Sequence, residues 1–323
     1  CGGSWSQVFY AVGPGLATAP NSSGPWEPAN CSQWQAHDLS LSAYDGMSVL
    51  LRFTAINDYG NRFYLDNVEV VNAGLRVALK VYLEGAYDST AVKMRDDLRT
   101  TGLIPSTEPY TSMGFTQASD GGGEVLQSGV TATSGDNAVV DWVLVELRNS
   151  ATPSSIIATR SALVQRDGDI VAEDGVSPVA LVATAGSYYV AVRHRNHLGV
   201  MTSTAVPLST TTTAINFTNP GLSTWGTQAQ KTIGAVMVMW AGNAKKDVPP
   251  PSLLKYTGGN SDRDAVLIRI GGVVPTATAA GYWVEDCTLD GVVKYTGAGN
   301  DRDPILVNIG GVVPTNTRME QLP

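Results

Sequence analysis

The chain of 323 residues is long enough for two or three domains of ordinary size. Only 15% of the residues are charged, and Gly, Ser, Thr, Asn and Val are abundant, a composition that favours strands and turns over helices. The formal net charge of -8 and the lack of a Lys/Arg cluster argue against a nucleic-acid partner. No apolar run is long enough to span a bilayer, so we expect no transmembrane segment.

The sequence begins at Cys1 beside a strand-like segment, from which we expect a processed or truncated piece of a longer precursor that is secreted or displayed on the cell surface. An alternative is a mature lipoprotein acylated at Cys1. Cys1 and Cys31 bracket a loop rich in Gly, Pro and Asn and could form a disulfide in an oxidising compartment, which would leave Cys287 unpaired. No CxxC pair is present, so a structural zinc site is not expected.

Residues 1–73 alternate strand-like and turn-like segments. Two apolar runs, 48–53 and 62–70, flank a polar turn over 57–61, a pattern typical of a β-hairpin. Together with 34–40, these segments resemble the closing half of a jelly-roll module, similar to MAM and carbohydrate-binding sandwiches, of the kind that follows secreted bacterial peptidases and adhesins. The resemblance implies a partial β-sandwich whose open edges a missing segment or a neighbouring subunit must cover.

Residues 74–217 carry short apolar runs separated by turns that contain Gly and Asp. Regular short strands of this kind predict an immunoglobulin-like sandwich, and the stretch resembles domains near the C-termini of large Bacteroidota surface proteins. We expect one short helix over 93–98 and a linker over the turn-rich segment 218–233. The expected strands are 75–83, 139–147, 156–164, 179–183 and 187–193.

Residues 234–323 contain an internal repeat. The 22-residue segments 255–276 and 294–315 are identical at 15 positions, at a spacing of 39 residues. Upstream, Trp240 aligns with Trp283 at a spacing of 43, because the first copy carries a four-residue insertion. Two such copies predict one supersecondary unit present twice.

The second copy has the spacing of a calcium loop. Asp286, Thr288 and Asp290 stand at loop positions 1, 3 and 5, with Gly at position 6. Calcium loops need oxygen ligands at alternating positions, and Gly permits the sharp turn. Either Asp301 or Asp303, at the start of an apolar, helix-like segment, could close the site.

This arrangement resembles a dockerin repeat, which is a calcium half-loop followed by a short helix, present twice. The resemblance implies calcium as the cofactor and a cohesin-like protein as a candidate partner. A dockerin loop closes with Asp at position 12, where this chain has Gly297, so the loop here is longer than in the family. The alternative is that the acidic segments are turns that cap short helices.

The first copy matches the pattern less well. Asn243 and Asp247 occupy positions 1 and 5, and Asp262 and Asp264 correspond to the closing pair. Lys245 occupies position 3, where its ammonium group would repel a cation. We therefore expect the first calcium site to be weak, altered or empty.

No catalytic signature is present. The chain lacks GxSxG, HExxH, Walker A and GxGxxG patterns, so we expect no enzyme activity. His194 and His197 have no acidic partner at a metal-motif spacing, and we expect surface or hydrogen-bonded histidines rather than ligands.

These observations predict a mainly β fold with a small α/loop module at its C-terminal end. We expect a non-enzymatic extracellular protein, such as a surface layer, adhesin or filament, that self-associates head to tail into a homopolymer and is stabilised by calcium. The alternative is a glycan- or cohesin-binding accessory region of a secreted hydrolase.

Overall fold

The computed structural model describes residues 5–20, 24, 26–37, 39, 41, 44, 49–56, 62–68, 74–245 and 251–323. It is 28% strand and 12% helix, which confirms the predicted mainly β fold. The chain divides into two compact units, Cys1–Val71 and Asn72–Pro323. Among the described residues, no helix has the length and apolar character needed to cross a membrane.

The unit Cys1–Val71 contains two short 3-10 helices, Gly13–Gly15 and Cys31–Gln33, with no strand among its described residues. The two runs expected to form a hairpin are described over 49–53 and 62–68, and the expected turn lies outside the described residues. None of the described residues of this unit is buried. The jelly-roll piece therefore stays a prediction.

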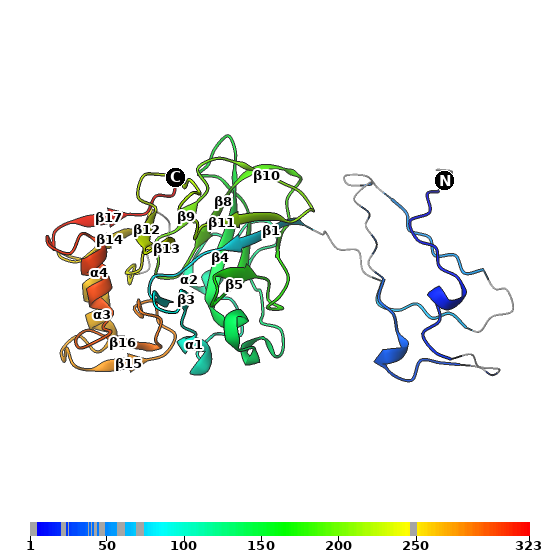
Figure 1. The fold of residues 1–323 in the computed structure, drawn as a ribbon, viewed down its shortest axis with the longest axis horizontal. Helices are drawn as coiled ribbons and strands as arrows, with labels where there is room; N and C mark the ends of the chain where they lie inside the picture. The colour runs from blue at the N-terminus through cyan, green and yellow to red at the C-terminus, as the bar shows by residue number, and fades with distance from the viewer. Residues whose placement is uncertain are drawn as a thin grey trace. The chain divides into compact units, whose positions relative to one another are not determined.

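A nine-stranded sheet dominates the second unit (Figure 1). Its path runs β10-β8-β4-β5-β6-β1-β11, with β7 added to β1 and β9 added to β8. The described pairs in this sheet are antiparallel except for β1 with β11. The strands are β1 (Leu75–Lys80), β4 (Val139–Asn149), β5 (Ile156–Gln165), β6 (Asp169–Val171), β7 (Val179–Leu181), β8 (Gly186–Arg193), β9 (Val200–Met201), β10 (Val206–Leu208) and β11 (Thr213–Asn216).

Strand β4 lies inside the sheet, between β5 and β8, and its residues are buried on both faces. Val143 and Val145 belong to the main core, whereas Trp142 and Leu144 pack on the other face around Tyr110. Burial on both faces explains why the segment 142–145 of this strand is a continuous apolar run rather than an alternating one.

The segment expected to form a helix over 93–98 is divided between two elements. Lys93–Met94 forms strand β3, which pairs with β2 (Tyr87–Asp88), and the one-turn helix α1 covers Asp97–Thr100. Met94 donates its backbone N–H to Arg166 across the chain. This tertiary contact prevents the helix from starting earlier. A second one-turn helix, α2, covers Tyr110–Met113.

The predicted linker over 218–233 is packed within the second unit. Strand β12 (Gln230–Ile233) pairs with β13 (Val236–Met239), and Ala229 and Gln230 are buried. The Gln230 side chain donates to the Phe217 carbonyl at 2.9 Å. Turn residues here connect packed strands rather than separate domains.

The two repeat copies form what we call the repeat module, residues 240–323. Each copy contributes a strand, a helix and a second strand: β14 (Leu253–Lys255), α3 (Asp262–Arg269) and β15 (Thr278–Ala280), then β16 (Val292–Lys294), α4 (Arg302–Asn308) and β17 (Thr317–Met319). The expected helix after each acidic segment is therefore present. β14 pairs with β17, and β15 pairs with β16, so each copy's last strand completes the other copy's first (Figure 1).

Candidate functional site

Asp301 lies at the centre of the second copy and is fully buried. Its carboxylate accepts the backbone N–H groups of Thr288, at 3.0 Å, and Lys294, at 2.8 Å. The Thr288 hydroxyl lies 3.0 Å from Asp301 and 3.3 Å from Asp286, which is also fully buried. Since one hydroxyl donates only one hydrogen bond, it cannot satisfy both carboxylates at once.

The two buried carboxyl groups disfavour each other's charge. Burial, followed by the charge of Asp286, raises the pKa of Asp301 to about 7. Burial also raises the pKa of Asp286 above its usual value, although Arg195 opposes the shift. Two carboxylates that share a site can be neutralised by a proton or by a cation.

The remaining loop residues close the turn around Asp286. Its carboxylate accepts the backbone N–H groups of Asp290, at 3.2 Å, and Gly291, at 2.9 Å. The Asp290 carboxylate accepts Val292 N–H at 2.9 Å and forms an ion pair with the Lys294 ammonium group. Asp290 therefore faces a cation that the chain itself supplies.

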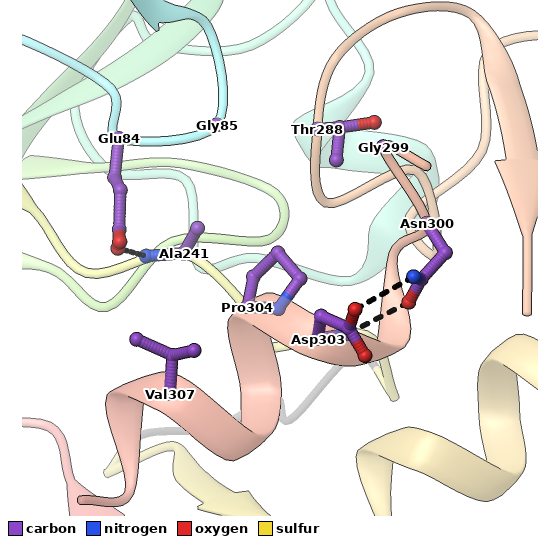
Figure 2. Close-up of a pocket in the computed structure, with 9 residues that line it drawn as sticks. All are labelled: Glu84, Gly85, Ala241, Thr288, Gly299, Asn300, Asp303, Pro304 and Val307. Carbon is purple, nitrogen blue, oxygen red and sulfur yellow. Dashed lines mark hydrogen bonds between the residues drawn. The ribbon is translucent and has the colours of Figure 1, made fainter. Parts of the chain in front are cut away.

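Asp303 is directed away from this group. Its carboxylate accepts the Asn300 side-chain amide at 2.8 Å (Figure 2). It also pairs with Arg302 at 3.1 Å. Asp303, Pro304 and Thr288 line an open groove of about 340 Å³ between helix α4 and the loop at Glu84. Of the two predicted closing residues, Asp301 alone lies with Asp286 and Thr288.

The first copy repeats the backbone arrangement with fewer charges. The fully buried Asp262 accepts Lys245 N–H at 3.2 Å and Lys255 N–H at 2.7 Å, as Asp301 does with the equivalent residues. Asn243 replaces Asp286 and is only 5% exposed, and its side-chain oxygen has no hydrogen-bond partner among the described residues. Asp264 pairs with Arg263 at 2.8 Å, and Asp247 lies outside the described residues.

Oxygen donors of this kind suit calcium, which binds carboxylates, carbonyls and hydroxyls. The second copy gathers two carboxylates and one hydroxyl. Over the described part of the chain, no group of three or more His, Cys, Asp and Glu side chains is arranged to hold a metal. Asp286, Thr288 and Asp301 are the oxygen donors of the second copy that lie closest together, and they are the candidate ligands of a hard cation.

Asn196, which sequence patterns did not single out, holds the first position of both loops. Its side-chain amide donates to the carbonyls of Val284, at 3.0 Å, and Asp286, at 2.6 Å. Its backbone carbonyl accepts the N–H groups of Gly242, at 3.1 Å, and Asn243, at 3.0 Å. The two copies are thus anchored on one residue that follows strand β8.

A buried polar cluster surrounds Asn196. His194 lies 3.1 Å from Asp141, which also accepts Arg195 at 3.0 Å and Tyr282 at 2.6 Å. Burial alone would raise the pKa of Asp141, but Arg195, His194 and Tyr282 outweigh it and lower the pKa to about 2. Burial lowers the pKa of His194 and, more strongly, that of His197. Both histidines are hydrogen-bonded and buried; their HxxH spacing was the only sequence signal.

Comparison of the chain with models of protein families, with curated proteins and with solved structures gives no match.

Proposed function

We propose that the chain is a non-enzymatic, extracellular structural or adhesive protein whose repeat module is stabilised by calcium. The observation that carries the proposal is the convergence of two fully buried carboxylates, Asp286 and Asp301, on the Thr288 hydroxyl. Two buried carboxylates this close together destabilise the folded state unless their charge is neutralised.

Asp286, Thr288 and Asp301 would hold the ion, which would supply the missing positive charge. Asp301 also bonds the backbone of Thr288 and of Lys294 in strand β16, so it ties the loop to the strand pair β15–β16. A cation bound to Asp301 would therefore stabilise both the loop and the strand pair β15–β16. In the first copy, Asn243 and Asp262 supply one charge fewer, which supports weaker binding there.

Exposed apolar side chains support self-association into a filament or layer. The equivalent residues Val273 and Val312 of the two copies are 83% and 85% exposed. The unit Cys1–Val71 also exposes large apolar side chains, such as Leu50 at 78% and Ile56 at 85%. We propose that a further copy of the same chain covers these side chains.

The calcium proposal is tested by thermal unfolding of the full chain with excess calcium and with EDTA. Calcium at about 100 times its Kd stabilises by about 2.7 kcal/mol, which raises the midpoint by roughly 5–10 °C. Asp301→Asn should abolish the rise, whereas Asp303→Asn should keep it. Equal midpoints in calcium and EDTA for the unaltered chain would remove the proposal's support.

Self-association is tested by electron imaging of the purified chain with and without the chelator. Ordered fibres or sheets would support the structural role. Discrete monomers that bind glycans or a cohesin-like protein would support an accessory binding role instead.

A further inference from the structure

Lys231, Asn308 and Glu84 meet at the contact between the sheet and helix α4. Lys231 lies on β12, Asn308 ends α4, and Glu84 follows β1. The Lys231 ammonium nitrogen lies 2.9 Å from the Asn308 side-chain oxygen and contacts Glu84 Oε1. Asn308 Nδ2 lies 2.6 Å from Glu84 Oε2. One carboxyl group therefore touches both the amine and the amide nitrogen.

We propose that Lys231 and Asn308 become joined by an amide bond between their side chains, with Glu84 as the catalytic residue. The proposal does not depend on calcium. It adds a covalent cross-link, formed by the chain itself, between the sheet and the repeat module.

The orientation of the Asn308 amide is fixed by its partners. Nδ2 also donates to the Ala241 carbonyl at 2.8 Å, and Ala241 N–H donates to Glu84 Oε2 at 2.9 Å. Because a carbonyl only accepts and an ammonium group only donates, Asn308 Oδ1 must face Lys231. The carbonyl carbon, one bond from Oδ1, is thus held beside the amine.

The site is largely shielded from water. Asn308 is fully buried, and the side chains of Lys231 and Glu84 are 22% and 13% exposed. The ring of Trp240 covers the amine, with its centroid 5.5 Å from the Lys231 nitrogen. Shielding of this kind keeps water from competing with the amine for the Asn308 carbonyl carbon.

The reaction needs no outside reagent. Glu84 Oε1 takes a proton from the Lys231 ammonium group, and the neutral amine attacks the Asn308 side-chain carbonyl carbon. A carbon–nitrogen bond forms, Glu84 delivers its proton to Nδ2 through Oε2, and the bond to Nδ2 breaks. The attacking nitrogen then gives its second proton to the released ammonia, and Glu84 returns to its ionised form. The net change converts ammonium and primary amide into a secondary amide and an ammonium ion.

The two repeat copies differ at the position of Asn308. The residue equivalent to Asn308 is Arg269, which pairs with Glu285 at 3.0 Å. Only the second copy therefore offers an amide to the sheet, and a single cross-link is expected per chain.

The test is the intact mass of the reduced and denatured full chain. The cross-linked chain is lighter than its sequence by one molecule of ammonia, and protease digestion yields a branched peptide that contains Lys231 and Asn308. A full-length mass with both residues in separate linear peptides would overturn the proposal. Loss of ammonia without the branched peptide would overturn it as well.

Variants identify the acting groups. Glu84→Gln and Lys231→Arg should restore the full mass and abolish the branched peptide. Lys255→Arg, which alters a lysine whose ammonium group donates to the Gly259 carbonyl at 2.9 Å, should leave the cross-link intact. If Glu84→Gln is poorly folded, the mass of the unaltered chain still decides the question.

Discussion

Thr257 and Thr296 hold equivalent positions in the two copies, and each donates its hydroxyl to the other copy. Thr257 bonds the Pro314 carbonyl and Thr296 the Pro275 carbonyl, both at 2.9 Å. The residue pairs differ by the repeat spacing of 39, as do the strand partners of β14–β17 and β15–β16. The module is thus a two-fold arrangement built within one chain.

The exchanged strand pairing predicts which engineered disulfides form. Leu254 is opposite Arg318, so cysteines at these two positions should cross-link within one chain. Cysteines at Val293 and Arg318, both in the second copy, should not. Non-reducing electrophoresis of the two double variants distinguishes them, and cross-linking of the second pair alone would contradict the exchange.

The raised pKa of Asp301 predicts a pH dependence without calcium. The folded pKa is about 7 against 3.8 in the unfolded chain, so this group favours folding at low pH, and its contribution is lost as pH rises from about 4 to about 7. Chemical unfolding in EDTA should show this loss in the unaltered chain and not in Asp301→Asn. Parallel pH profiles for the two proteins would be inconsistent with a charged, repelling pair.

The buried histidines predict the opposite trend. His197 accepts Gly85 N–H through Nε2 at 3.1 Å, and its pKa lies well below 6.5, so the unfolded chain takes up protons first. Its contribution to stability should fall as pH drops below about 6.5. His197→Gln should flatten this part of the unfolding profile, whereas the exposed His37→Gln should follow the unaltered chain.

Asn196→Ala should loosen the second copy more than the first. It removes the side-chain hydrogen bonds to Val284 and Asp286, with an expected loss of about 1–3 kcal/mol, but it keeps the backbone carbonyl that accepts Gly242 and Asn243. Hydrogen exchange should accelerate in the loop 284–291 and change little at 242–245. Asn219→Ala, at an exposed turn, is the matched control and should change neither. Equal acceleration in the two loops would argue against this division between side-chain and backbone anchors.

Local patterns predicted much of the fold. The apolar runs at β4, β5 and β8 are strands because their residues fill the core from both faces or alternate across it. The helices after Asp262 and Asp301 also follow from the repeat. The pairing of β14 with β17 could not be predicted, because three-residue strands with near-identical neighbours are compatible with pairing inside a copy or between copies.

The candidate site was predicted in part, because some of its residues follow a local spacing and others do not. The spacing identified Asp286, Thr288 and Asp301, but it did not separate Asp301 from Asp303, since only the backbone direction at the start of α4 turns one inward. The cluster around Asn196 joins segments far apart in the chain, and its residues form no local pattern. Contacts of that kind become visible only in three dimensions.

The exchange of strands also limits how the module can grow. Within each copy, the first strand pairs with the last strand of the other copy, so a third copy would find each of these strands already paired and its own two strands would lack the matching partners. Lengthening of this module by duplication would therefore have to add copies in pairs. Deletion of one copy would leave both strands of the remaining copy without their partners.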